Sequence, residues 1–384
     1  MSELVERARA MAPGLAERSA EIEAARRVPA ELSDALGAEG FYRMLVPAAL
    51  GGGEVHPRVF AAALEELARG DAAAAWVVMT GSTTGLLLAY LEEGAARTIL
   101  DARAEAALAG VFAPTGRAVP EAGGYRVSGR WAYGSGCENA AWRAGGCLVF
   151  EGERPRTLPG GGVEIRTCFF PAEDVRVEDT WEVSGLRGTG SHDLVVEDVF
   201  VPAERSCCVL ADAPRHDGAL YRFPLFGLLS TGVAAVGLGI ARAALDAVME
   251  MARTKRSRGG KRTMAEGELV QVTLARAEGR LRAARALVHE TLDAVWETAA
   301  AGAALGDEER ARIRLAATHA AETAAGVVDR VYTLAGGAAI WSRSPLQRHL
   351  RDVHVMTQHV MVGEPTLKPV GRILLGLETD SSQL

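Results

Sequence analysis

Apolar residues recur every three or four positions through the first hundred residues of the chain, in stretches such as "VPAELSDALGAEGFYRML" and "RVFAAALEELARGDAAAAWVVM". This period predicts amphipathic helices, because one face of a helix repeats every 3.6 residues. The segment "GFYRMLVPAALGGGEV" interrupts the pattern with Pro and three successive Gly, which indicates a loop. We therefore expect an N-terminal helical bundle over residues 1–108.

Residues 109–215 change to short alternating runs, including "GYRVSGRWAYG", "GVEIRTCFF" and "HDLVVEDVFVP", separated by Gly, Pro and Asp. Alternation of this kind predicts the strands of a central antiparallel sheet or barrel. Helical runs return over 216–384 and predict a C-terminal four-helix-type bundle. The most apolar run, residues 223–246, contains Pro, Ser, Thr and Gly, so a buried helix explains it better than a membrane span. The fold class is thus α+β.

Composition narrows the range of partners. The 384 residues carry 42 basic and 49 acidic side chains, and a formal charge of -7 argues against a broad nucleic-acid or anionic-membrane surface. A small molecule is the expected partner. Five cysteines without C-x-x-C spacing indicate reduced thiols, and the charged N-terminus has no apolar secretion segment, so we expect a cytoplasmic protein.

The stretch "WAYGSGCENAAW" places Ser135 between Gly134 and Gly136, with aromatic residues on either side. Small neighbours let the backbone approach a ligand, and the hydroxyl can hold it. A strand-end turn in which the serine satisfies its own backbone is the structural alternative. Cys137 is expected to be a small apolar filler, since no base can be assigned to it.

Two glycine-rich stretches offer further candidates. "LRGTGSHD" presents the hydroxyls of Thr189 and Ser191, which suit a polar ligand edge or a phosphate, although an ordinary loop would look the same. "YTLAGGAAIW" places Gly336 and Gly337 at a helix end, where a simple C-cap is the alternative. The eight histidines are scattered and predict no metal site.

The stretch "SPLQRHLRDVHVMTQHVMVGEPT" begins with a helix-start signal at Ser344–Pro345 and is predicted to run helically to Gly363. On such a helix Arg348, Asp352 and His359 lie near one face, while His354 and Gln358 lie on an adjacent one.

In the order of its parts and in the phrases "AALGGGEV", "RVSGRWAYGSGCENAAW", "GLRGTGSHDLVVEDVFVP", "LAGGAAIWSRSPLQRHLRDVH" and "GRILLG", the chain resembles the acyl-CoA dehydrogenase superfamily. Within it, the chain looks most like the oxygenase components of two-component flavin-dependent monooxygenases. The resemblance implies an acyl-CoA dehydrogenase-like fold, a homotetramer, a reductase partner, and reduced FMN or reduced FAD that reacts with dioxygen through a C4a-hydroperoxide.

The resemblance also implies roles for individual residues. Ser135 would lie near the reactive flavin nitrogen, with Trp131 and Tyr133 as walls that exclude water. Thr189, Ser191, Gly336, Gly337 and Arg258 would contact the flavin, Arg258 through its phosphate within the ambiguous Arg-rich run 253–263, while Phe112 in "FAPTGRA" would line the flavin or the substrate.

The dehydrogenases carry a catalytic Glu near the end of the C-terminal helix, where this chain has His359 and Val360. A neutral imidazole can accept a phenolic proton, so His359 is the candidate substrate base or orienting group, with His354 in reserve. Hydroxylation of an aromatic or polycyclic substrate is the leading function. The alternatives are an FAD-dependent acyl-CoA dehydrogenase whose base has moved to Glu266 or Glu268, and a bundle protein that binds flavin or a partner without turnover. No nicotinamide-binding G-x-G-x-x-G follows a strand, so reduced flavin must come from elsewhere.

Overall fold

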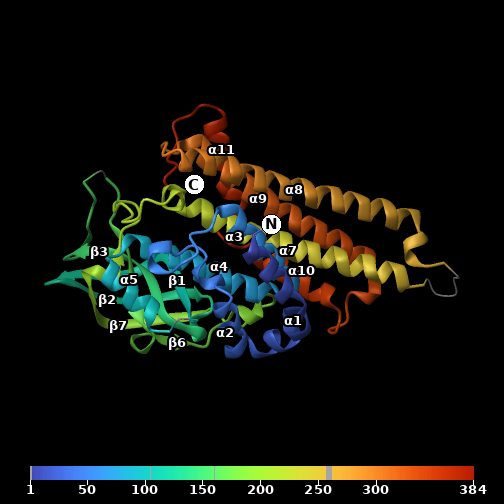
Figure 1. Cartoon of the computed structure of the whole chain (residues 1–384), viewed down its shortest axis with the longest axis horizontal. Coiled ribbons are helices and arrows are strands. Elements are labelled where there is room, and N and C mark those ends of the chain that lie inside the picture. The colour runs from blue at the N-terminus through green and yellow to red at the C-terminus, as the bar shows by residue number, and fades with distance from the viewer. Residues whose placement is uncertain (1, 104, 160, 257–261) are drawn as a thin grey trace.

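The computed structural model describes residues 2–103, 105–159, 161–256 and 262–384. It has helices first, then a β domain, then helices again, as the hydrophobic pattern predicts. The sheet lies at one end of the molecule and the long C-terminal helices at the other (Figure 1). Helix α4 packs against strand β1 on one side and helix α7 on the other, so it joins the two ends.

Residues 2–103 form the α-helices α1 (Glu3–Ala25), α2 (Ala30–Ala38), α3 (Pro57–Gly70), α4 (Ala72–Leu86) and α5 (Glu93–Asp101). Asp71 separates α3 from α4, because its backbone is extended and its carboxylate accepts a hydrogen bond of 2.9 Å from the Ala74 N–H. That bond caps the start of α4. A Cβ at Gly70 would lie 2.4 Å from the Ala12 carbonyl oxygen, so only glycine allows α1 to pack this closely here.

The β domain is one sheet in the order β6-β7-β2-β1-β3-β5-β8, with β4 paired to β3. The strands are β1 (Ala107–Glu121), β2 (Gly124–Gly134), β3 (Ala140–Glu151), β4 (Arg154–Pro155), β5 (Ile165–Pro171), β6 (Arg176–Glu178), β7 (His192–Pro202) and β8 (Ser206–Cys207). The expected antiparallel sheet is wrong in one respect, since β1 and β3 run parallel. After β2 returns beside β1, the chain crosses through the short 3-10 helix η4 (Cys137–Asn139) to the other edge of β1. There β3 runs in the same direction as β1.

Trp131 fills the centre of the β domain. Its side chain is 1% exposed, its indole N–H donates to the Gly146 carbonyl at 2.7 Å, and its ring lies 5.8 Å from that of Phe170. A Cβ added at Gly116, Gly129 or Gly145 would approach this ring within 2.4–2.7 Å. The glycines therefore make room for the indole rather than for a ligand.

The C-terminal part contains α6 (Ala219–Arg222), α7 (Leu225–Thr254), α8 (Glu268–Ala300), α9 (Asp307–Ala335), α10 (Pro345–Met356) and α11 (Leu367–Leu374). Residues 72–90 and helix α7 are long and apolar enough to cross a membrane, but 94% and 89% of their most apolar windows are buried inside the protein. The expectation of a buried helix at 223–246 is met, because α7 packs against α3, α4 and α9. All five cysteines are free and buried.

Gly145→Ala should lower the free energy of unfolding by about 1–3 kcal/mol, because the added methyl group overlaps the Trp131 ring. Urea denaturation followed by circular dichroism measures the change. Gly14→Ala is the matched control: nothing lies within 4 Å of its new methyl group, and alanine in an exposed helix should leave stability equal or raise it by up to ~1 kcal/mol. Equal stability of the two variants would show that Trp131 is not tightly enclosed.

Candidate active site

Three buried hydroxyl groups meet beside the ends of β2 and β7. Ser135 follows β2, Ser191 precedes β7, and Thr189 ends the 3-10 helix η6 (Arg187–Thr189). The Oγ atoms of Ser135 and Ser191 lie 2.8 Å apart, and Ser191 Oγ lies 2.7 Å from Thr189 Oγ1. Three residues that the sequence offered as separate cofactor contacts thus form one cluster.

The hydrogen bonds of this cluster have a single direction. Each hydroxyl has one hydrogen, and Thr189 gives its own to the Leu186 carbonyl at 2.9 Å. Ser191 must then donate to Thr189, and Ser135 must donate to Ser191. The indole N–H of Trp76, in α4, donates to Ser135 Oγ at 3.2 Å. Each of the three hydroxyl hydrogens already has an acceptor, so Ser135 can offer a ligand only a lone pair of its oxygen.

Glycines let this cluster form, although they do so differently from our expectation. Gly136 has φ +71°, and a Cβ there would lie 2.7 Å from the Val77 side chain of α4. A Cβ at Gly134 would lie 2.8 Å from the Leu194 side chain of β7. The two glycines bring the turn against α4 and β7, and the Gly136 N–H donates to the Thr189 carbonyl at 2.8 Å.

The backbone of Leu186 connects this cluster to the C-terminal bundle. Its N–H donates to the Asp352 carboxylate of α10 at 2.6 Å, and its carbonyl also accepts the Trp181 indole N–H at 3.1 Å. Burial raises the pKa of Asp352 to about 7, against the opposing effect of the Leu186 hydrogen bond. Asp352 thus turns toward the hydroxyl cluster rather than toward His359.

His359 does not lie on the helix predicted for 344–363, and that expectation is wrong at its C-terminal end. Helix α10 ends at Met356, and the amides of Gln358 and His359 bond three residues back, to Val355 and Met356. These tighter turns rotate the chain away from the face of α10. The His359 ring instead lies edge-on to Trp76, with ring centroids 5.5 Å apart, and so adjoins the hydroxyl cluster.

The protonation state of His359 follows from its contacts. Its Nδ1 accepts the Met361 N–H at 3.2 Å, and burial, aided by the positive charge of Arg314, lowers its pKa to about 4. The neutral ring must therefore carry its proton on Nε2, for which the described part of the chain provides no acceptor. In this tautomer Nε2 donates and cannot take up a proton. The geometry favours the role of orienting group over that of base.

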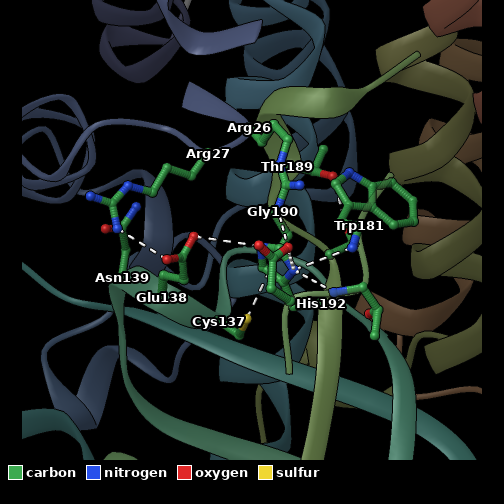
Figure 2. Close-up of polar contacts among 12 residues, drawn as sticks. Arg26, Arg27, Cys137, Glu138, Asn139, Trp181, Thr189, Gly190 and His192 are labelled. Carbon is green, nitrogen blue, oxygen red and sulfur yellow. Dashed lines mark hydrogen bonds and ion pairs between the residues drawn. The ribbon is translucent and has the colours of Figure 1, made fainter. Parts of the chain in front are cut away.

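A second polar cluster, the His192 latch, ties the N-terminal helices to the β domain (Figure 2). The buried His192 ring accepts the backbone N–H groups of Thr180 and Trp181 at its Nδ1, at 3.2 and 3.3 Å. Its Nε2 lies 3.7 Å from the Glu138 carboxylate. The sequence does not single out this histidine, because one His at the start of a strand carries no distinguishing pattern.

Two arginines from the end of α1 complete the latch. Arg27 pairs with Glu138 at 3.0 Å, and Arg26, whose φ is +55°, pairs with Asp179, which lies 3.3 Å from His192 Nδ1. On the other side the Cys137 thiol donates to the Gly190 carbonyl at 3.5 Å (Figure 2). The latch therefore holds the two turns that carry Ser135 and Ser191, and Cys137 is a packed thiol as expected.

Two aromatic candidates lie apart from the hydroxyl cluster. Trp131 is enclosed by the β-domain core and has no surface for a cofactor, which contradicts its expected role as a wall. Tyr133 is 70% exposed, has φ +70°, and contacts Trp181 edge to face at 6.1 Å between ring centroids. Phe112 of β1 is partly buried against the main core.

The remaining candidates lie on the C-terminal helices. His354 is half exposed and pairs with Asp329 of α9 at 2.8 Å, away from the hydroxyl cluster. Gly336, with φ +58°, is the C-cap of α9, which is the structural alternative to a flavin contact. Gly337 is exposed beside it. Arg258 lies outside the described residues. Among the residues that are described, no three His, Cys, Asp or Glu gather as metal ligands would.

The chain matches the families described as "Acyl-CoA dehydrogenase, N-terminal domain" over residues 2–105 and "Acyl-CoA dehydrogenase, C-terminal domain" over 231–364. It is 36% identical to indole-3-acetate monooxygenase of Pseudomonas putida, across 94% of this chain and 90% of that protein. It is 31% identical to the oxygenase subunit HsaA, a flavin-dependent monooxygenase of Rhodococcus jostii, across 92% and 93%. The chain belongs to the flavin-dependent monooxygenases of the acyl-CoA dehydrogenase superfamily.

The fold agrees with this flavin-dependent monooxygenase family. The structure of XiaF from Streptomyces sp. in complex with FADH2 and glycerol superposes with a TM-score of 0.90 at 29% identity, covering 98% of this chain and 96% of that one. In this monooxygenase the hydroxyl cluster, Trp76 and His359 form the candidate active site.

Because His359 is neutral in the folded protein and has an ordinary pKa near 6.5 when unfolded, the unfolded chain binds more protons between pH 6.5 and pH 4. Its contribution to stability is complete above pH 6.5 and is lost as the pH falls toward 4. When the pH is lowered from 7 to 5, the free energy of unfolding should therefore fall by about 1–2 kcal/mol less in His359→Gln than in the unmodified protein. Urea denaturation at both pH values measures this difference, and parallel losses in the two proteins would contradict a low pKa of His359.

Proposed function

We propose that this chain is the oxygenase component of a two-component flavin-dependent monooxygenase that hydroxylates a small aromatic substrate. The observation that carries the proposal is the polarity of the candidate site: Ser135 offers an acceptor lone pair, while His359 offers an Nε2–H donor. Reduced flavin carries a hydrogen on its N5 that an acceptor can bind, so the donor set fits the reduced form of the cofactor.

The bound reduced flavin would supply the two electrons that activate dioxygen, through a C4a-hydroperoxide, so that one oxygen atom enters the substrate and the other leaves as water. The chain itself contributes buried groups without charge. Ser135 would hold an N–H of the ring without releasing its own proton, and Trp76 of α4 would cover Ser135 from that side. His359 donates Nε2–H to a substrate oxygen and so orients the aromatic ring.

The finer parts of the proposal rest on the relatives. The structure of XiaF with FADH2 favours reduced FAD, with reduced FMN as the other choice. The description of HsaA as an oxygenase subunit supports a separate reductase, and the name indole-3-acetate monooxygenase supports an aromatic substrate class, because indole is an aromatic ring system. A cytoplasmic location remains part of the proposal, as does a homotetramer. Large exposed side chains support the homotetramer: Leu269, Ile340, Trp341, Val360, Leu374 and Leu375.

The alternative, an acyl-CoA dehydrogenase, needs a carboxylate base, for which Glu266 and Glu268 are the candidates. Glu266 instead closes a capping box with Thr263, which lowers its pKa and commits its oxygens. Glu268 is exposed at the first position of α8. Neither carboxylate has the contacts of a buried base beside the hydroxyl cluster.

Rapid mixing of the protein and anaerobically reduced FAD with oxygenated buffer should give a flavin–oxygen adduct that persists before oxidised flavin appears. Ser135→Ala should shorten its lifetime by roughly tenfold, the effect of one hydrogen bond of about 1.4 kcal/mol, and should release more hydrogen peroxide. Absorbance and peroxide assays measure both quantities, and the same experiment with FMN compares the two flavins.

Ser128→Ala is the matched control, because Ser128 lies on β2, the strand that Ser135 follows, but is exposed and accepts the Asp198 N–H. It should leave the adduct lifetime unchanged. Immediate oxidation of the flavin by the unmodified protein, together with flavin reduction by an acyl-CoA, would overturn the proposal in favour of the dehydrogenase.

A further inference from the structure

Arg314 of α9 is a buried cation to which the described residues offer no anionic partner. Its side chain is 2% exposed, and the described part of the chain places no carboxylate against it, so burial lowers its pKa to about 10. Its Nε is buried and has no hydrogen-bond partner among the described residues. Burying a charge in this way costs stability unless the charge has another role.

The guanidinium holds two backbone carbonyls instead. Nη1 donates to the Met361 carbonyl at 3.2 Å, and Nη2 donates to the Gln383 carbonyl at 2.6 Å. The first of these contacts lies directly beside the candidate site, because the N–H of the same Met361 residue donates to His359 Nδ1.

The contacts form a sequence from α9 to the hydroxyl cluster. Arg314 restrains the turn at Met361, and the Met361 N–H occupies His359 Nδ1. The His359 ring then rests against Trp76, whose N–H is given to Ser135. The positive charge of Arg314 also opposes a second positive charge on the imidazole.

We propose that Arg314 is a positioning residue that keeps His359 in one neutral form, with its proton on Nε2 and pointing away from Met361. It does so through the Met361 turn and through its charge, and it does not itself touch the substrate. The proposal deepens the proposed function, in which His359 orients the substrate, but it concerns the ring of His359 in the protein without flavin.

The competing explanation is that Arg314 only stabilises the C-terminal segment, through its hydrogen bond to the Gln383 carbonyl. A purely stabilising role would affect the free energy of unfolding and leave the tautomer and pKa of His359 unchanged. The two explanations therefore differ in a spectroscopic property of one ring.

Nitrogen-15 NMR of histidine-labelled protein reads this property directly, with the His359 signals assigned by their loss in His359→Asn. In the unmodified protein we expect a pyrrole-type Nε2, a pyridine-type Nδ1, and no titration between pH 5 and 8. Arg314→Met should mix the two tautomers and raise the pKa of His359 toward its ordinary value, because the opposing positive charge is removed. Arg314→Lys, which keeps the charge, should keep the pKa low.

Arg312→Met is the matched control, because Arg312 lies on the same helix but forms an exposed ion pair with Glu308 at 2.8 Å. It should leave both ring signals unchanged. A folded Arg314→Met protein that keeps the Nε2 proton and the low pKa would overturn the proposal. If that variant does not fold, Arg314→Gln tests the same point, since loss of the charge must again raise the pKa of His359. Because no flavin is present, failure here leaves the proposed function standing.

Discussion

The candidate site depends on the backbone of one residue, Leu186. Its backbone has φ +50°, a left-handed conformation that costs a leucine roughly 1–2 kcal/mol. The Asp352 carboxylate holds its N–H, while its carbonyl receives the hydroxyl of Thr189 and the indole of Trp181. Hydrogen bonds from Asp352 of α10, Thr189 of η6 and Trp181 thus offset the strain. Because Thr189 donates to the Leu186 carbonyl, this carbonyl also fixes the donor direction of the hydrogen bonds among the three hydroxyl groups.

Much of the fold could be predicted, because the sequence signals are local. The segments "GYRVSGRWAYG" and "HDLVVEDVFVP" match β2 and β7, and the long helical runs match α8 and α9 closely. The parallel pairing of β1 with β3 could not be predicted from alternation, since alternation sets which face a side chain occupies but not which strand lies beside it. The end of α10 was missed for a similar reason: three-residue turns at 357–359 keep a nearly helical spacing.

The candidate site was predicted in part. Ser135, Thr189 and Ser191 were found because glycine-rich hydroxyl stretches are visible in the sequence, and the structure joins them. Trp76 was missed because almost every residue of α4 is buried, so no face of that helix stands out and its tryptophan resembles ordinary core. Trp131, in contrast, was chosen for its neighbours in sequence, and only the sheet shows that its ring points into the β domain.

The burial of all five cysteines affects how their thiols can react with hydrogen peroxide. An oxygenase that handles reduced flavin in air is exposed to hydrogen peroxide whenever turnover is incomplete, and peroxide attacks thiolates rather than thiols. Burial raises the pKa of Cys137 to about 11 and raises those of Cys207 and Cys208 as well. Burial therefore favours the protonated form of these three thiols, the form that reacts slowly with hydrogen peroxide.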